Sequence, residues 1–291
     1  MKIFPGMVIF NKPTVQLLNS STAVACTGAV RLHIAFLLAG IAAMIPIYSA
    51  FALIVYATYT LDRSIDCAGD TINNPGRCGA DRNIGLAAAL AAFCLGSYLF
   101  VREGIFLAPL LPLLIGFLYT RGIRIGSGVY TLKGSCGAKN CVTAITWGGT
   151  IALITSHWCT SIATIAVIFI FYFSKMFVNS VVFDFKDIMG DKAAGIRTLP
   201  VWIGETLTRV VLIVIILVLY IFMISTINAG FIRNEWVILL YGLCIPSWFL
   251  LFYSSSFEAQ AGIFGRRLRQ IVIIGEPALS LAARSCMGVL I

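Results

Sequence analysis

The residues best suited to chemistry in this chain are its seven aspartates, which all lie in two connections, 62–81 and 184–191. Six of them form two triplets with neighbours three or four positions apart: Asp62, Asp66 and Asp70, and Asp184, Asp187 and Asp191. On a helix this spacing places each triplet on one face, within roughly 80°. Carboxylates so close together repel one another, and beside a membrane they are costly unless a cation lies between them. The spacing therefore predicts sites for a hard divalent cation, and carboxylate oxygens with room for water and phosphate favour magnesium.

Basic side chains accompany both triplets. Arg63 and Arg77 lie in the first stretch, and Lys186 and Lys192 lie in the second. Two bound cations bridge the oxygens of a diphosphate while Lys and Arg neutralise the remaining charge, so we interpret these stretches as a diphosphate site. The alternative is that both are solvated loop faces in which Asp and Asn cap helices and form turns, as INNPGR suggests. Two triplets, each directly after a long apolar run, favour the site.

The elements that must position these aspartates are apolar helices. Of the 291 residues, 59% are hydrophobic and 11% are charged, and the mean hydropathy is +0.96, unlike any ordinary soluble domain. Apolar runs close to the roughly 18–20 residues needed to cross a bilayer recur along the chain, without the alternation of barrel strands. We therefore expect a single all-α polytopic membrane domain over residues 1–291. The nine expected spans are 13–30, 34–60, 83–101, 104–120, 140–156, 159–181, 207–227, 235–253 and 271–290.

The basic residues predict the orientation of this bundle. Nine spans place sixteen of the 21 Lys and Arg residues on one side of the membrane, which we take as cytoplasmic, together with both triplets. Without the first span, which polar residues such as Gln16 and Asn19 weaken, the N-terminus moves outside and the asymmetry remains. The net charge of +9 is spread over short loops beside lipid, so it favours anionic headgroups or an anionic substrate, not nucleic acid.

Other reactive residue types carry weaker signals. The nine cysteines form no CxxC pair, and we interpret them as small apolar residues. Lys175 lies inside a span, where a lysine snorkels, pairs with another charge, or touches substrate. His33 and His157 are expected at the opposite ends of the spans from the aspartates, so neither is a good candidate for a general base.

The motifs themselves resemble those of a known family. DFKDIMGD, residues 184–191, matches DxxDxxxD, the second motif of the UbiA-type intramembrane prenyltransferases, and AAGIRTLPVWIG is similar to its usual continuation. DRSIDCAGD, residues 62–70, resembles the first motif, NDxxDxxxD, with Asp62 in place of Asn and Arg63 in place of Asp. Asp62 can replace an amide as an oxygen ligand, whereas Arg63 cannot bind a cation and can instead reach phosphate. LKGSCGAKNCVTAITWGG, residues 132–149, is similar to a basic connection of the family.

This resemblance implies nine helices around a central cavity, with the two motifs facing each other across its cytoplasmic mouth. Two Mg²⁺ ions and an isoprenyl diphosphate would bind there, with the prenyl tail in the cavity. The implied metal ligands are Asp62, Asp66, Asp70, Asp184, Asp187 and Asp191. The implied diphosphate-binding residues are Arg63, Arg77, Lys133, Lys139, Asn140, Lys186 and Lys192. The residues expected to act in catalysis are Asp66, Lys139 and Asp187.

The implied reaction is Mg²⁺-dependent transfer of a polyprenyl group to an apolar acceptor, an aromatic compound or a lipid, as in quinone, tetrapyrrole or ether-lipid biosynthesis. An allylic diphosphate would ionise and an electron-rich acceptor would attack the carbocation. A terpene cyclase or a phosphoribosyl-type transferase on the same fold stays open. A transporter is less consistent, because its charges should lie at broken helices near the bilayer midplane. An inactive substrate-binding member is allowed by Arg63, although five of the six motif aspartates are present.

Overall fold

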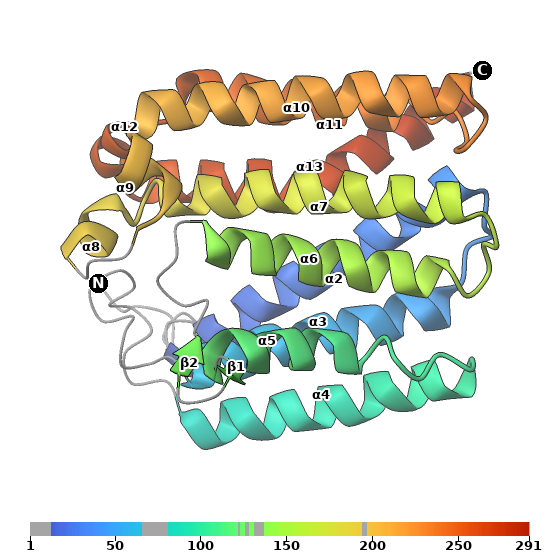
Figure 1. Ribbon diagram of the computed structural model, residues 1–291, viewed down its shortest axis with the longest axis horizontal. Coiled ribbons are helices and arrows are strands. Elements are labelled where there is room, and N and C mark those ends of the chain that lie inside the picture. The colour runs from blue at the N-terminus through green and yellow to red at the C-terminus, as the bar shows by residue number, and fades with distance from the viewer. Residues whose placement is uncertain are drawn as a thin grey trace, which may run out of the picture. The chain divides into compact units, whose positions relative to one another are not determined.

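The computed structural model describes residues 13–65, 81–121, 123–125, 128–130, 137–193 and 197–290 (Figure 1). Long helices dominate this part of the chain, which confirms the predicted all-α class. They are α2 Pro13–Ala39, α3 Ile45–Ile65, α4 Arg82–Arg102, α5 Leu110–Arg121, α6 Ala138–Thr155, α7 Ile162–Asp184, α10 Glu205–Asn228, α11 Trp236–Phe252 and α13 Ile263–Leu290. Three shorter helices are α8 Ile188–Ala193, α9 Leu199–Ile203 and α12 Ser255–Ala261.

A small antiparallel hairpin lies between α5 and α6, in a stretch that the sequence analysis treats as a loop. Strand β1, Ile123–Ile125, pairs with β2, Gly128–Tyr130, with Ile123 opposite Tyr130. The sequence IRIGSGVY carries the signal, because branched and aromatic residues lie on both sides of Gly-Ser-Gly.

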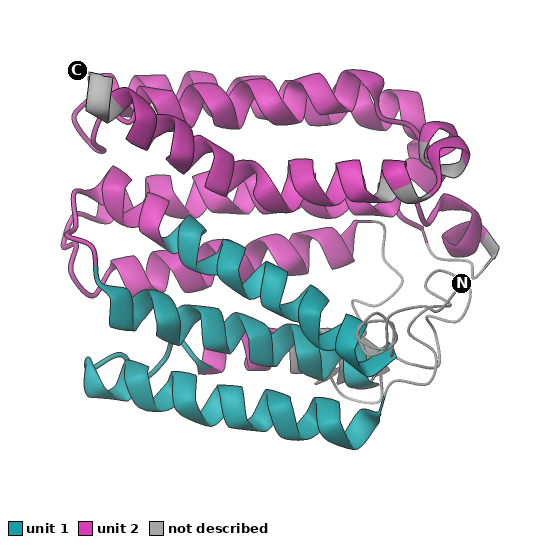
Figure 2. Cartoon of the chain, turned by 180° about the vertical axis from the view of Figure 1, so that it is seen from behind, with its two compact units in different colours: residues 1–32, 44–109 teal, residues 33–43, 110–291 magenta. Residues whose placement is uncertain are grey.

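The helices form two compact units (Figure 2). Unit 1 comprises residues 1–32 and 44–109, and it contains most of α2 together with α3 and α4. Unit 2 comprises residues 33–43 and 110–291, and it contains the last turns of α2 and every element from α5 onward. The expectation of a single domain over residues 1–291 stays a prediction.

In the described part of the chain, five helices are long and apolar enough to span a membrane: Pro13–Ala39, Ile45–Ser64, Arg82–Arg102, Ile162–Asp184 and Glu205–Asn228. The protein is therefore an integral membrane protein by the composition and length of its helices. Each of the nine expected spans overlaps one of the long helices described above. The number of membrane crossings and their orientation stay predictions.

The predicted break between the first two spans is wrong. The chain does not turn at 31–33, because α2 continues through Arg31, which is 6% exposed, and ends at Ala39. The turn comes at Gly40, whose φ of 73° is unfavourable for other residues. A Cβ at Gly40 would also lie 2.5 Å from Nε of Arg233, so glycine is required there for two reasons.

Two other predicted boundaries also differ from the structure. The helix expected from residue 104 begins at Leu110, after Gly104 adopts a φ of 79°. The helix expected from residue 271 begins at Ile263, so the basic run 266–269 belongs to a helix and not to a loop.

Helices α6 and α7 approach closely at Gly148. A Cβ added there would lie 3.0 Å from the backbone oxygen of Phe169 and 3.0 Å from the backbone nitrogen of Phe173. Small residues permit such close packing of membrane helices. This contact places the first turn of α6 beside the last turns of α7.

Gly148→Ala is expected to lower the stability of the protein by about 1–3 kcal/mol, because the added methyl group meets the α7 backbone and α6 must shift. Gly149→Ala is the matched control. Its Cβ would meet only Cδ2 of Leu111, at 3.4 Å, and alanine favours a helix over glycine by about 1 kcal/mol. Thermal unfolding in detergent measures both variants. Equal unfolding midpoints for the two would show that the α6–α7 contact relaxes without cost.

Candidate active site

The end of α7 and the start of α6 bring a carboxylate, an amide and an ammonium group together. Asp184, the last residue of α7, is 1% exposed. Asn140 Nδ2 donates a hydrogen bond to Asp184 Oδ2 at 2.8 Å, and Lys139 Nζ lies 3.6 Å from Asp184 Oδ1. Both partners come from the first turn of α6, so one helix engages both oxygens of Asp184. A buried carboxylate requires partners of this kind.

Ser180 is a member of this group that the sequence analysis missed. Asn140 Nδ2 also lies 3.1 Å from Ser180 Oγ, to which it donates. Ser180 lies one turn before Asp184 on the same helix face, so its spacing was the available signal. With the amide nitrogen turned to these two acceptors, Asn140 Oδ1 is buried and has no hydrogen-bond partner among the described residues.

Asp184, Asp187 and Asp191 do not lie on one continuous helix, which is the condition under which their spacing places them on one face. Helix α7 ends at Asp184, and a turn precedes α8. Within this bend the backbone N–H of Asp187 donates to the backbone carbonyl oxygen of Asp184 at 3.0 Å. The backbone N–H of Asp191 donates to the backbone carbonyl oxygen of Asp187 at 2.7 Å. The Phe185 side chain is fully buried, with its ring 6.1 Å from the ring of Tyr253, and this anchors the bend. The three aspartates nevertheless stay within two short turns of one another.

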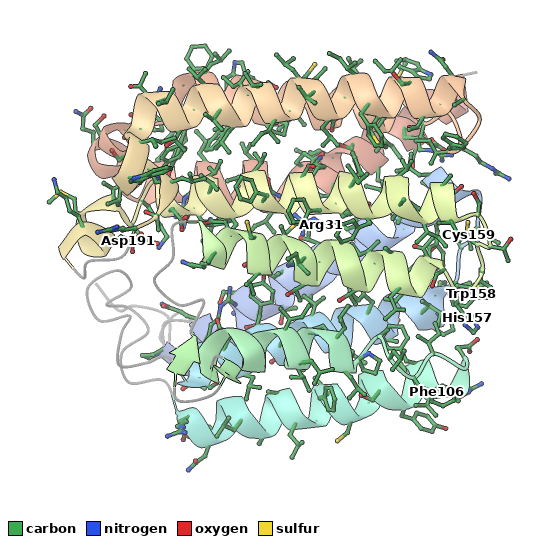
Figure 3. The ribbon with its side chains drawn as sticks, in the orientation of Figure 1. Arg31, Phe106, His157, Trp158, Cys159 and Asp191 are labelled. Carbon is green, nitrogen blue, oxygen red and sulfur yellow. The ribbon has the colours of Figure 1, made fainter. Side chains whose placement is uncertain are left out.

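Asp191 lies in α8 and is 6% exposed (Figure 3). Burial raises the pKa of its carboxyl group; the Lys139 ammonium opposes this shift, and the Asp187 carboxylate adds to it. Asp187 itself is paired with Lys186, whose Nζ lies 2.7 Å from its Oδ1. In the part of the chain that the structure describes, Asp191 Oδ2 is buried without a hydrogen-bond partner.

Two buried oxygens at this end of α7, Asn140 Oδ1 and Asp191 Oδ2, thus lack a donor within the described ranges. Hard oxygen atoms of this kind suit Mg²⁺, which completes its shell with water and phosphate. Among the described residues, no three His, Cys, Asp or Glu side chains lie close enough to hold a metal by themselves. The predicted ligands Asp66 and Asp70 lie outside those ranges. A metal at the second motif would therefore need ligands from outside this group.

In unit 1, the structure describes only the start of the first motif. Asp62 is exposed on α3. Arg63 NH1 donates to Ser20 Oγ at 3.0 Å and to Ser21 Oγ at 2.9 Å, and its guanidinium carbon lies 5.3 Å from the centre of the Tyr59 ring. Arg63 therefore connects α3 to α2, a contact that the sequence analysis did not foresee. Its predicted role in binding phosphate stays a prediction.

Arg63→Met is expected to lower the free energy of unfolding by about 1–3 kcal/mol, because it removes charge-assisted hydrogen bonds and leaves two serines without their donor. Ser20→Ala is the control, since Ser21 still accepts from the guanidinium. Thermal unfolding checks the stability, and the KM for diphosphate substrate, measured in parallel, reports any role in binding. If Arg63→Met keeps wild-type stability but has a raised KM, the contact of Arg63 with α2 does not stabilise the protein.

The remaining predicted site residues divide by position. Lys192 is exposed in α8. The other predicted residues, Asp66, Asp70, Arg77 and Lys133, lie outside the described residues. The structure brings together Lys139, Asn140, Asp184, Lys186, Asp187 and Asp191. Figure 3 shows His157 in the turn after α6, at the opposite end of α7 from Asp191, as the sequence predicts.

Comparison with known proteins decides the family. A sequence model of the UbiA prenyltransferase family matches residues 17–262, a range that includes both aspartate motifs. The chain belongs to the UbiA prenyltransferase family. This confirms the resemblance of the motifs, and it makes the chain an intramembrane prenyltransferase by family. No curated protein matches the chain.

Solved structures of UbiA homologues share the fold. One, from Archaeoglobus fulgidus and bound to GPP and Mg²⁺, is 15% identical with a TM-score of 0.58, over 94% of this chain and 99% of that chain. Another, the apo form from Aeropyrum pernix K1, is 12% identical with a TM-score of 0.59, over 89% and 97% of the two chains. A digeranylgeranylglyceryl phosphate synthase is 14% identical with a TM-score of 0.54, over 95% and 99%. At these identities the likeness establishes the fold, and it confirms the predicted UbiA-like class.

Proposed function

We propose that this UbiA family member transfers a polyprenyl group from an isoprenyl diphosphate to an aromatic or lipid acceptor in a reaction that requires Mg²⁺. The observation that carries the proposal is the contact of the buried Asp184 and Asn140 with the exposed Lys139 at one end of two apolar helices. It combines an oxygen-rich acidic motif with an ammonium suited to diphosphate. The A. fulgidus homologue, whose structure contains GPP and Mg²⁺, supports this pair of ligands.

In this proposal the acidic residues hold the cations. Two Mg²⁺ ions, when bound, would neutralise the charge that grows on the departing diphosphate. The proposed ligands are Asp184, Asp187 and Asp191 in the second motif and Asp62, Asp66 and Asp70 in the first. Asp191 Oδ2 and Asn140 Oδ1, for which the described residues supply no hydrogen-bond donor, are consistent with a cation at the second motif.

The basic residues have a different task, which is to bind and orient the diphosphate. Lys139 is 56% exposed and lies 3.6 Å from Asp184, and an ammonium has three donors, so it can contact Asp184 and a phosphate oxygen together. Lys186, paired with Asp187, is placed to act in the same way. The bond from the allylic carbon to the diphosphate oxygen breaks, and its electron pair leaves with the diphosphate. The acceptor then supplies the pair that forms the new bond and gives up a proton, which the released diphosphate can accept. The apolar helices keep water from competing for the cation.

The side of the membrane and the acceptor belong to the proposal as well. The distribution of Lys and Arg supports an active site on the cytoplasmic side. Quinone precursors, tetrapyrroles and ether lipids are the acceptor classes to test. A terpene cyclase or phosphoribosyl-type transferase on the same fold is the second candidate. The observation that favours it is Arg63, which lies at the start of the first motif and donates hydrogen bonds to two serines of α2.

The test uses the purified protein in lipid nanodiscs with Mg²⁺, labelled isoprenyl diphosphates of increasing length, and a panel of acceptors. We expect diphosphate release and a prenylated acceptor, both abolished by EDTA. Diphosphate release without any acceptor, accompanied by a cyclic hydrocarbon, would replace the transferase by a cyclase. No diphosphate release from any donor, with or without acceptor, would contradict the proposed substrate class.

A further inference from the structure

A second group of polar residues lies inside unit 2, away from the aspartates. Lys175 Nζ of α7 lies 2.7 Å from Glu276 Oε1 of α13, and the two side chains are 13% and 5% exposed. Ser280 Oγ donates to the same carboxylate oxygen at 3.2 Å. Of the three interpretations of Lys175 given above, the structure supports pairing with another charge. Charged residues in such positions of a membrane protein commonly mark functional sites.

This group faces away from the candidate active site. Lys175 precedes Asp184 by nine residues, which places the two side chains on roughly opposite faces of α7. Asp184 contacts α6, whereas Lys175 contacts α13. The two groups are therefore separate sites on one helix.

Helix α11 leaves room for polar atoms at Gly242. The position that a Gly242 Cβ would occupy lies 3.1 Å from Lys175 Nζ and 3.2 Å from Glu276 Oε1, and the Tyr220 hydroxyl is closer still. Tyr220 is 4% exposed, and its hydroxyl has no hydrogen-bond partner in the described part of the chain. Three polar side chains from α7, α10 and α13 thus converge on a point where α11 has no side chain.

Two prolines add backbone acceptors to the same region. Pro246 in α11 and Pro277 in α13 have no N–H, so neither can bond to the carbonyl four residues earlier. Those carbonyls belong to Gly242 and Ile273. Membrane helices tolerate such interruptions where side chains or ordered water satisfy the released carbonyl groups.

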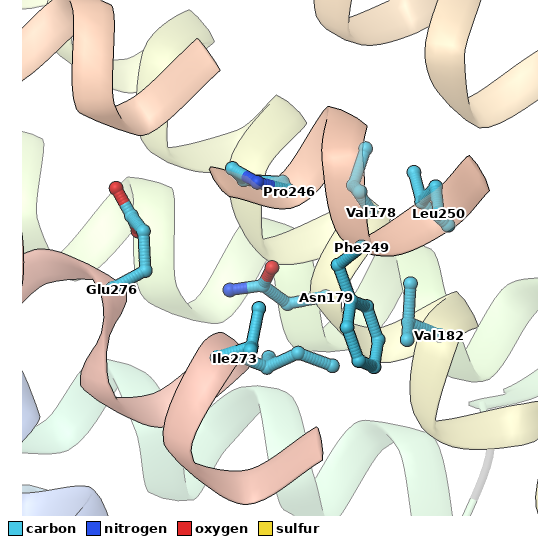
Figure 4. Close-up of a pocket in the computed structure, with 9 residues that line it drawn as sticks. Val178, Asn179, Val182, Pro246, Phe249, Leu250, Ile273 and Glu276 are labelled. Carbon is cyan, nitrogen blue, oxygen red and sulfur yellow. The ribbon is translucent and has the colours of Figure 1, made fainter. Parts of the chain in front are cut away.

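A small pocket adjoins this group, between α7, α11 and α13 (Figure 4). Its volume is about 10 Å³, which is close to the space that one water molecule needs. Of the described residues that line it, Asn179 and Glu276 have polar side chains, and the others are apolar residues that include Pro246, Phe249 and Ile273. Asn179 is 8% exposed, and its side chain lies at the pocket.

We propose that this pocket is a binding site for one hydroxyl group, supplied by a water molecule or by the alcohol of a membrane lipid, held between Asn179 and Glu276. A hydroxyl group both donates and accepts, so it can donate to the carboxylate and accept from the amide. A buried water requires two to four polar partners, and the Asn179 amide and the Glu276 carboxylate are two such groups at this pocket. The site connects α7 to the two proline-containing helices, and it does not depend on the proposed reaction.

Radiolytic footprinting of the full-length protein in nanodiscs tests this site. X-ray pulses generate hydroxyl radicals from water in place, so a buried side chain is oxidised when it adjoins a bound water. Phe249, 3% exposed, lines the pocket, whereas Phe36 and Phe100, both 0% exposed, do not. With water in the site, we expect Phe249 to be oxidised several-fold faster than Phe36 and Phe100, and Asn179→Leu to abolish the difference.

The same measurement distinguishes the lipid source. A lipid alcohol in the pocket would protect Phe249 as purified, would be retained in native mass spectrometry, and would leave Phe249 oxidisable after delipidation. The comparison of Phe249 with the control rings is made in the wild-type protein, so it does not depend on whether Asn179→Leu folds. Equal protection of all three rings before and after delipidation, with no retained lipid, would overturn the proposal.

Discussion

Asp191→Asn is expected to reduce Mg²⁺-dependent prenyl transfer by roughly 100-fold, equivalent to about 3 kcal/mol of transition-state stabilisation, without loss of fold stability. The carboxylate is 6% exposed, and its Oδ2 has no hydrogen-bond partner among the described residues. An amide of the same shape fills the same space but removes the negative charge proposed to hold a cation. Turnover with saturating labelled diphosphate measures the effect.

Although Asp191→Asn is expected to lose activity, its stability in the absence of Mg²⁺ should be equal to or higher than that of the wild type. Burial raises the pKa of Asp191, so the folded protein binds its proton more tightly than the unfolded chain does. Without Mg²⁺, the ionised carboxylate therefore lowers stability above the raised pKa, and this loss disappears as the pH falls below the ordinary aspartate value. Asp191→Asn should remove this dependence and unfold at an equal or higher temperature in EDTA at neutral pH.

Asp81→Asn provides a control with the same chemical change. Asp81 is exposed at the start of α4, where it accepts hydrogen bonds from the backbone N–H groups of Asn83 and Ile84. Asparagine caps a helix about as well as aspartate, so both turnover and stability should stay near wild type. Wild-type turnover in Asp191→Asn would show that Asp191 does not hold the cation, and a clear loss of stability in this variant would show that Asp191 has a structural role.

The helices were predictable because a long apolar run in a membrane must satisfy its own backbone hydrogen bonds, which a helix does. The ends of the helices were less predictable. The first break was expected near Arg31 because a charge suggests a loop, yet Arg31 is buried within α2. The better signal was Gly40 followed by Pro46, since glycine commonly follows the last turn of a helix and proline cannot continue one. Residue type alone misled here, and the order of glycine and proline along the chain would have corrected it.

The acidic motifs were predictable for a different reason, because spacing along one chain segment carries the information. The contacts that organise them join distant segments. Asn140 is separated from Asp184 by 44 positions, and Arg63 is separated from Ser20 by 43. Such pairs depend on how two helices pack, and in α6 and α7 the packing depends on Gly148, whose role in a close approach is visible only in three dimensions.

Asn140→Leu is expected to have the second large effect, because this amide is the closest partner of Asp184. Leucine matches its size but cannot donate, so among the described residues a carboxylate that is 1% exposed would keep only the side-chain contact with Lys139, at 3.6 Å. Leaving a buried charged acceptor short of a donor costs about 3 kcal/mol or more. We expect a lower unfolding temperature and, because Asp184 loses the hydrogen bond that fixes its position beside Lys139, a lower kcat for diphosphate release.

Ser180→Ala is the matched control for Asn140→Leu, and Asn140→Asp tests the link to Mg²⁺. Ser180→Ala removes only the second acceptor of the amide and should cost less than about 1 kcal/mol. Equal losses of stability in Ser180→Ala and Asn140→Leu would show that the Asn140–Asp184 hydrogen bond contributes no more than the Asn140–Ser180 one.

Asn140→Asp places a second carboxylate against Asp184, so without Mg²⁺ their repulsion should destabilise the protein at least as much as leucine does. Added Mg²⁺ should then raise the unfolding temperature of Asn140→Asp more than that of Asn140→Leu, because the new carboxylate is itself an oxygen ligand, and equal responses would count against a cation at this end of α7.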